Sequence, residues 1–236
     1  MQKTAFRSSV EIAIIGGGAS GALTAVNLLQ KWRGVPGVPP LKLTLIDAQA
    51  GLGRGVAYGT DCSLHLLNVP AKGMSAYPDQ PDNFYEWLVS VQEDAIPETF
   101  ARRSLYGEYL QHQLASTWLQ PSATARLTSL KSKATAVARQ DDIYVVQLDS
   151  GDQIKCDALV LALGNFPPQF GSYGDNDWFH NNPWDPSLSQ TIGTQDTVLL
   201  IGTGLTMIDV ALLLSCRGHL GQLHAVSRHG YVPQPH

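Results

Sequence analysis

The hydrophobic pattern at the start of the chain predicts a strand, a helix and a second strand. Residues 10–15 (VEIAII) form a short β-branched run that ends at glycine, which is typical of a buried parallel strand. Apolar residues then recur at helical spacing and predict a helix to about Trp32. Residues 34–40 are rich in Pro and Gly and predict a loop, and residues 41–46 (LKLTLI) predict the next strand, closed by Asp47. This order predicts a right-handed βαβ unit.

The middle of the chain predicts two helices followed by β-structure. Residues 84–91 and 103–119 have helical patterns. Residues 127–137, 143–148 and 153–163 form a three-part β-rich stretch, with hairpin residues at 149–152. Residues 165–196 are rich in Pro, Gly and Asn with little periodicity, and they predict a connector between domains.

After the connector, the first pattern begins again. Residues 197–201 (TVLLI) predict a strand that runs into a glycine turn, and residues 222–226 predict the next strand. Between them we expect a helix that ends at Arg217 and Gly218. One face of this helix is predicted to carry Ile208, Ala211, Leu212 and Ser215. We therefore predict an α/β fold: a Rossmann-type domain with a β-meander, plus a partial second βαβ unit.

Composition excludes several classes of partner. The 236 residues carry a formal charge of −4 without clustered Lys and Arg, so we expect no nucleic-acid partner. No apolar run approaches the roughly 18 residues of a membrane span, and Glu11 interrupts the N-terminal apolar stretch. The three cysteines, Cys62, Cys156 and Cys216, include no Cys-x-x-Cys, so neither a metal site nor a redox dithiol has support. We expect three buried thiols in a soluble, cytoplasmic protein.

The first glycine turn has the spacing of a dinucleotide-binding fingerprint. Gly16 allows a tight turn, Gly18 has no side chain to block a pyrophosphate, and Gly21 allows close packing of helix and sheet. The helix N-terminus offers N–H groups and partial positive charge to phosphates. An acid at the end of the second strand can bind an adenosine ribose. The candidate residues are Gly16, Gly18, Ala19, Ser20, Gly21 and Asp47.

The second glycine turn departs from this fingerprint, because Met207 stands where the third glycine should be. One alternative is a degenerate unit that binds nothing. Against it, Ser227 and Arg228 follow the next strand, and Arg228 can pair with a 2′-phosphate, which favours NADPH over NADH. The candidate residues are Gly202, Gly204, Leu205, Thr206, Ser227 and Arg228.

Five segments together resemble the bacterial FAD/NAD(P)-binding family, many members of which are uncharacterised. They are residues 14–21 (IIGGGASG), 53–60 (GRGVAYGT), 65–70 (HLLNVP), 103–110 (RSLYGEYL) and 200–209 (LIGTGLTMID). More distantly, the layout is similar to flavin-containing monooxygenases, including the N-hydroxylating enzymes. The resemblance implies an FAD-binding domain at residues 1–165, a connector at 166–196, and a partial NAD(P)-binding unit at 197–236.

The resemblance also implies further FAD contacts. The loop at residues 53–60 would pass over the flavin side, Asn68 and Val69 would lie near the isoalloxazine, and residues 162–165 would meet the cofactor. The implied residues are Gly53, Arg54, Tyr58, Asn68, Val69, Ala162, Gly164 and Asn165. Each has a plainer alternative: Arg54 can be solvated, and Tyr58, Tyr106 and Tyr109 can be packing residues. His65 and His180 are isolated, and no side chain stands out as a general acid or base.

The function that these features predict is an FAD-dependent, monooxygenase-like oxidoreductase with a small-molecule substrate, reduced by NADPH. One alternative is a cofactor-binding module without turnover, or a fragment of a larger flavoprotein, since similar flavoproteins continue beyond this point. Another is an NAD-dependent dehydrogenase with no flavin, with NAD at residues 16–21.

Overall fold

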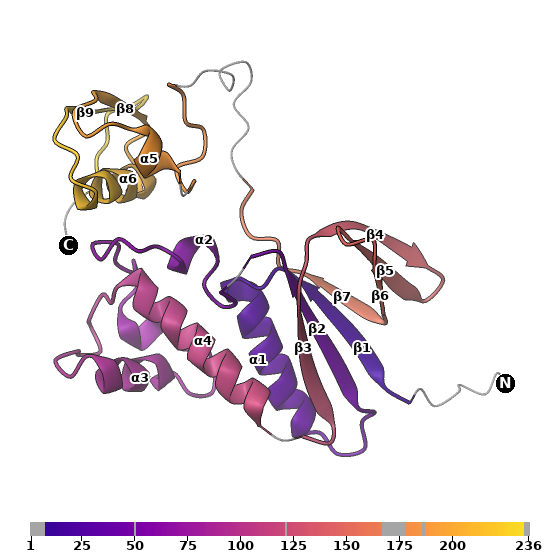
Figure 1. Ribbon diagram of the computed structural model, residues 1–236. Helices are drawn as coiled ribbons and strands as arrows, with labels where there is room; N and C mark the ends of the chain where they lie inside the picture. Colours follow the sequence, from indigo (N-terminus) through magenta and orange to yellow (C-terminus); the bar gives the residue numbers. More distant parts are fainter. Residues whose placement is uncertain (1–7, 50, 121, 167–177, 186, 234–236) are drawn as a thin grey trace. The chain divides into compact units, whose positions relative to one another are not determined.

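The computed structural model describes residues 8–49, 51–120, 122–166, 178–185 and 187–233 (Figure 1). The chain folds as two compact units, which we describe separately. The first contains Met1–Gly59 and Leu67–Gly164, and the second contains Thr60–Leu66 and Asn165–His236. A short piece of chain from the middle of the first unit's sequence therefore belongs to the second.

A parallel sheet of four strands forms the centre of the first unit. Its strands are β1 (Val10–Ile15), β2 (Leu41–Asp47), β3 (Ala125–Lys131) and β7 (Ala158–Leu161), in the order β3-β2-β1-β7. The central strand β1 pairs in parallel with β2 and β7, and β2 with β3. The predicted strand–helix–strand unit is confirmed, with α1 (Ala19–Arg33) as the crossover helix.

Helices cover one face of this sheet (Figure 1). After α1 come α2 (Gly55–Tyr58), the 3₁₀ turn η1 (Ala71–Gly73), α3 (Asn83–Val91) and α4 (Arg103–Leu119). The apolar core between helices and sheet contains Ile14 and Leu43 from the strands, Leu29 from α1, and Phe84 and Tyr109 from the later helices. Both helices expected in the middle of the chain are present.

A three-stranded antiparallel sheet covers the opposite face (Figure 1). It consists of β4 (Ala134–Gln140), β5 (Ile143–Leu148) and β6 (Gln153–Cys156), and it is the expected β-meander. Because side chains alternate along a strand, Ala13 and Ile15 of β1 face this layer and pack with Val146 and Leu148. The first unit therefore has three layers.

The predicted division of residues 127–163 into three β-parts was wrong. The region contains five strands, of which the first and last, β3 and β7, belong to the parallel sheet. The alternation of apolar residues marks a strand but not its partner, and the breaks at residues 132–133 and at Asp157 are too short to show in the hydrophobic pattern.

The second unit contains a smaller βαβ arrangement. Strands β8 (Val198–Ile201) and β9 (Leu223–Val226) are parallel and joined by α6 (Leu205–Cys216), as expected. A short helix, α5 (Leu188–Thr191), lies within the predicted connector, of which residues 167–177 and 186 lie outside the described part. Leu188, Val210 and Leu214 form the small core.

Helix α6 buries a different face from the one that carries Ile208, Ala211, Leu212 and Ser215. Val210 and Leu214 are its most buried apolar residues, whereas Ser215 is exposed and Ile208, Ala211 and Leu212 are only partly buried. The sequence LTMIDVALLLSC is apolar nearly all round, so periodicity does not select one face.

Candidate functional site

The first glycine turn connects β1 to α1, and the fold itself requires two of its glycines. Gly16 has φ +103°, and a Cβ atom there would lie 2.1 Å from the carbonyl oxygen of Ala162. A Cβ on Gly21 would lie 1.8 Å from the carbonyl oxygen of Gly16. Backbone atoms cannot yield as a flexible side chain can, so these positions exclude other residues whether or not a ligand binds.

Gly18 lies in a different environment, at the N-cap of α1. Its φ of −66° suits any residue, and no side-chain hydrogen bond caps the helix there. The nearest neighbour of an added Cβ would be the Cα of Gly55, at 3.3 Å. Backbone atoms of two glycine-rich segments therefore border the start of α1. A helix N-terminus bordered by backbone suits a diphosphate, because its N–H groups and dipole attract anions.

Asp47 lies at the same turn, at the end of β2. Its Oδ2 accepts a hydrogen bond from the Gly17 N–H at 2.5 Å, and its Oδ1 accepts one from the Gln49 N–H at 2.7 Å. A carboxylate oxygen has two lone pairs, so each oxygen retains capacity for a further donor. The carboxylate thus lies beside the turn, where the fingerprint puts an acid that binds ribose hydroxyls.

The loop at residues 53–58 is fixed against the glycine turn. The Gly53 N–H donates to the Gly17 carbonyl at 2.7 Å. Gly53 and Gly55 have φ of +92° and +57°, values that favour glycine, and an added Cβ on Gly55 would lie 3.2 Å from the Gly18 Cα. The loop and the turn that the sequence analysis proposed separately are therefore neighbours.

Arg54 is bound to helix α4. Its Nε donates to Gln111 Oε1 at 2.9 Å, and its Nη2 lies 3.9 Å from Glu108 Oε1. The predicted alternatives for this side chain were contact with the cofactor or solvation. In the structure this side chain helps to hold the loop on α4, and its contact with the cofactor stays a prediction.

Tyr58 also anchors the loop on α4. Its ring packs edge-on against Tyr106, with centroids 4.7 Å apart, and burial raises the pKa of the Tyr58 phenol. Gly107 permits this approach, because an added Cβ would lie 2.6 Å from the Tyr58 carbonyl oxygen. The sequence analysis did not single out Gly107. A glycine inside a helix destabilises that helix. Its presence at position 107 could therefore have indicated that another part of the backbone approaches the helix there.

The remaining residues proposed to contact FAD lie in different surroundings. Ala162 lies at the glycine turn, where its N–H donates to the Ile15 carbonyl at 2.8 Å. Gly164 has φ +68° at the end of the first unit, and Asn165, which is exposed, begins the second. Asn68 is exposed, and Val69 is half-buried before η1.

The second glycine turn is more open than the first. Gly202 has φ +112°, and its N–H donates to the Val226 carbonyl at 2.7 Å. A Cβ on Gly202 or Gly204 would meet no described atom within 4 Å. Leu205 and Thr206 are exposed in the first turn of α6. The second turn therefore lacks the close backbone contacts that surround Gly16 and Gly21 in the first.

The residues after β9 differ in their contacts. The Ser227 hydroxyl accepts hydrogen bonds from the Thr203 hydroxyl at 2.9 Å and from the Gly230 N–H at 3.0 Å. The Thr203 hydroxyl also contacts the Tyr231 carbonyl. Arg228 is exposed, and among the described residues its guanidinium has no ion-pair partner. Ser227 thus shapes the turn, while Arg228 is available to an anion.

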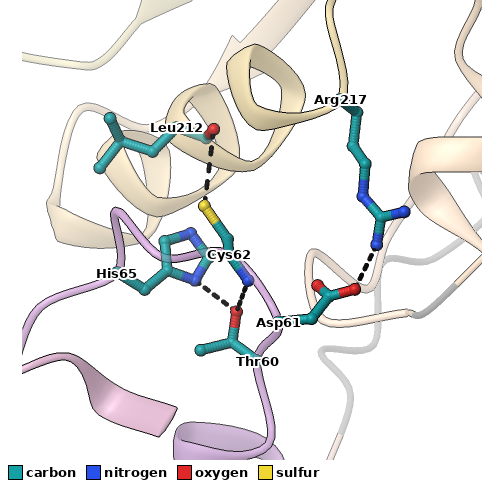
Figure 2. Close-up of polar contacts among 6 residues, drawn as sticks. All are labelled: Thr60, Asp61, Cys62, His65, Leu212 and Arg217. Atoms are coloured by element: carbon teal, nitrogen blue, oxygen red, sulfur yellow. Dashed lines mark hydrogen bonds and ion pairs between the residues drawn. The ribbon is translucent and has the colours of Figure 1, made fainter. Parts of the chain in front are cut away.

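His65 is a structural residue of the second unit (Figure 2). It is 2% exposed, and its Nε2 donates to the Asp209 carbonyl at 2.8 Å. In the neutral ring Nδ1 then accepts from the Thr60 hydroxyl, also at 2.8 Å. His180, in contrast, is exposed.

The prediction that all three cysteines are buried was wrong for one of them. Cys62 and Cys156 are buried, but Cys216 is exposed, because it ends α6 beyond the last core residue, Leu214.

Within the described residues, no group of three His, Cys, Asp or Glu side chains could hold a metal ion. None of the helices in that part of the chain is long and apolar enough to cross a membrane.

A groove of about 550 Å³ lies elsewhere on the first unit, between the parallel sheet and the meander. Its lining includes Lys42, Arg126 and Lys155, and it contains none of the residues proposed for the cofactors.

The chain belongs to the FAD-NAD(P)-binding family, whose model matches residues 13–166. This range contains the first glycine turn, Asp47, the loop at residues 53–58 and Ala162. The expected family is therefore confirmed.

Among curated proteins, the chain is similar to the monooxygenase cfoE of Aspergillus candidus. The two are 27% identical over 213 residues, which cover 86% of this chain and 33% of that protein. The chain thus spans about a third of the length of this relative.

Solved flavoprotein structures share the fold. The ornithine N-hydroxylase KtzI of Kutzneria sp. 744, solved with reduced FAD, NADP⁺ and L-ornithine, has a TM-score of 0.63 at 14% identity, covering 97% of this chain and 55% of that one. A mutant flavin monooxygenase from Stenotrophomonas maltophilia has a TM-score of 0.59 at 20% identity, with coverage of 94% and 58%. The cyclohexanone monooxygenase of Rhodococcus sp. Phi1, bound to NADP⁺, has a TM-score of 0.56 at 19% identity, with coverage of 92% and 38%.

Proposed function

We propose that this chain is the cofactor-binding part of an FAD-dependent, monooxygenase-like oxidoreductase that is reduced by NADPH and acts on a small molecule in the cytoplasm. The first unit would bind FAD, and the second would bind NADPH. When bound, FAD supplies the redox chemistry and NADPH the hydride, while the protein contributes position and electrostatics.

The observation that carries this proposal is the arrangement of backbone and carboxylate around Gly18. The N-terminus of α1, the backbone of residues 53–55 and the Asp47 carboxylate meet at one point of the first unit. A diphosphate fits the helix N-terminus, and a ribose fits the carboxylate beside it. This is the recognition chemistry of an ADP moiety, which is the half of FAD that we assign to these residues.

The case for NADPH rests on Arg228. Its exposed guanidinium follows β9 in the second unit, at the position where an acid would bind the ribose of NADH. A guanidinium binds a 2′-phosphate through charge-assisted hydrogen bonds, each contributing roughly 1.5–3 kcal/mol. The second unit is therefore suited to the phosphorylated cofactor.

The test is an absorbance spectrum of the FAD-loaded protein, recorded without oxygen before and after addition of NADPH. We expect the oxidised-flavin bands to disappear. With the Arg228→Ala variant, the NADPH concentration needed for half-maximal reduction should rise about tenfold, which is roughly 1.4 kcal/mol, while that for NADH stays unchanged.

The alternatives give different spectra. A yellow protein whose flavin NADPH does not reduce would be the cofactor-binding module without turnover. A protein that binds NAD(P) and no flavin would be the plain dehydrogenase. Either result would overturn the proposal.

A further inference from the structure

The segment Thr60–Leu66 lies along helix α6 within the second unit, and Figure 2 shows Asp61 and Cys62 with their partners on or just after this helix. Three polar contacts show that the segment runs antiparallel to α6. Residue numbers rise along the segment while those of the contacted residues fall. The contacts are Asp61 with Arg217 at 2.6 Å, Cys62 Sγ with the Leu212 carbonyl at 3.8 Å, and His65 Nε2 with the Asp209 carbonyl at 2.8 Å.

This alignment brings Cys62 to Cys216. In an α-helix the carbonyl of one residue points to the amide four positions later, so a sulfur atom at the Leu212 carbonyl lies at the level of Cys216. Asp61 precedes Cys62 and Arg217 follows Cys216, and the ion pair between them agrees with the same register. Burial and a hydrogen bond with the Cys216 thiol both raise the pKa of Cys62, so the two thiols are in contact. Their sequence separation of more than 150 positions concealed this proximity.

We propose that Cys62 and Cys216 are a redox-active thiol pair that hydrogen peroxide oxidises to a reversible disulfide, which locks segment Thr60–Leu66 onto α6. The proposal does not depend on the flavin assignment. A disulfide needs Cβ atoms about 3.5–4.5 Å apart, so the two side chains must turn toward each other before the bond forms. Both cysteines are free thiols in the structure.

The two residues have different exposure, and this assigns their roles. Cys216 is exposed, so its thiolate attacks peroxide first: a sulfur–oxygen bond forms, the O–O bond breaks, and hydroxide leaves. Cys62 is 4% exposed, and its thiolate then attacks the sulfenic sulfur. The S–S bond forms and a second hydroxide leaves. With the two thiol protons, the hydroxides give two molecules of water, and one peroxide is reduced for each disulfide made.

The experiment treats the folded chain with hydrogen peroxide, removes the peroxide, unfolds the chain in guanidinium with an alkylating reagent that blocks the remaining thiols, and measures intact mass and peptide masses. We expect the number of alkylated thiols to fall from three to one, with the remaining label on Cys156 and a peptide linking Cys62 to Cys216. Dithiothreitol should restore all three. The oxidised protein should also unfold at a higher temperature, because the cross-link constrains the unfolded chain.

Cys156→Ser is the matched control, because it removes the third thiol, which lies in the first unit; this variant should still form the disulfide. Cys216→Ser changes an exposed side chain, so the variant should fold, and its Cys62 should remain a thiol after peroxide. The proposal is overturned if peroxide carries Cys216 to sulfinic acid while Cys62 stays alkylatable. It is equally overturned if the linked peptide arises only between two chains.

Discussion

The three glycines of the first turn have different physical roles. Gly16 and Gly21 are required because backbone carbonyls lie about 2 Å from where their Cβ atoms would be. Gly18 adopts a φ that any residue can adopt. A Cβ added to it would have the Gly55 Cα as its nearest neighbour, at 3.3 Å. The G-x-G-x-x-G pattern alone therefore shows a tight turn, and Gly18 carries the information about a ligand.

This difference predicts the effect of Gly18→Ala. The added methyl group would occupy the space beside the α1 N-terminus where we place the diphosphate, so the Kd for FAD should rise at least about tenfold, or roughly 1.4 kcal/mol. The unfolding midpoint should change little, since only a few tenths of an ångström of adjustment at Gly55 are needed. Fluorescence titration with FAD and a thermal melt measure the two quantities.

Gly34→Ala is the matched control at the other end of α1. Gly34 has φ −83°, and its added Cβ would make ordinary contacts, at 3.6 Å with the Lys31 carbonyl oxygen. Both the Kd for FAD and the midpoint should match the unchanged protein. Unimpaired FAD binding by Gly18→Ala would refute the role that we give this residue.

Single residues were predictable from the sequence where backbone geometry dictated them. Asp47 and the glycines follow from the order of strand, turn and helix, because the ends of adjacent parallel strands meet at one edge. The partners of Arg54 on α4 could not be predicted, since a hydrogen bond across 57 positions leaves no periodic signal. The proximity of Cys62 and Cys216 was concealed for the same reason.

At the scale of elements, helices were easier to predict than strand partners. Helices α1, α3 and α4 end within a residue or two of the expected bounds, because each contributes apolar residues to the core that the helices share with the parallel sheet. Strands β3 and β7 were recognised as extended chain but placed with the meander, because a strand pattern does not state which sheet it joins. The buried face of α6 could not be predicted from the sequence, because nearly all its faces are apolar.

The aromatic cluster on α3 and α4 predicts how stability depends on pH. Tyr109 is fully buried, with its ring 5.0 Å from Phe84, and burial raises the pKa of its phenol to about 12. The fold therefore favours the neutral form. Below pH 10 the phenol is neutral in both states; above it the unfolded chain ionises first. The free energy of unfolding should fall as pH rises from about 10 to 12.

Tyr109→Phe tests this linkage. The Tyr109 hydroxyl accepts a hydrogen bond from the Ala76 N–H at 2.9 Å and donates to Asn83 at 2.7 Å, so the variant should lose about 1–2 kcal/mol at neutral pH. Its stability should then fall less steeply above pH 10. Urea unfolding at a series of pH values measures both effects, with reductant present to protect the cysteines. Parallel curves for the two proteins would contradict the assignment.

At the scale of the whole molecule, the two units surround their glycine turns differently. The family match covers residues 13–166, which contain the glycine turn, Asp47 and the loop that borders Gly18. In the second unit, Gly202 and Gly204 lie in an open turn, and Arg228 is the main argument for a cofactor. The sequence predicted this repeated glycine turn correctly, but it could not show how many contacts surround each copy.

The central claim is that the first unit binds FAD through its ADP half. Competition binding tests it most directly: FAD is bound to the chain and then displaced by ADP or by FMN, with flavin fluorescence as the signal for ADP and radiolabelled FAD for FMN. We predict that ADP displaces FAD, because it has the diphosphate and ribose that Gly18 and Asp47 are placed to bind, whereas FMN at the same concentration does not. Displacement by FMN and not by ADP would contradict the account, as would a chain that binds no FAD.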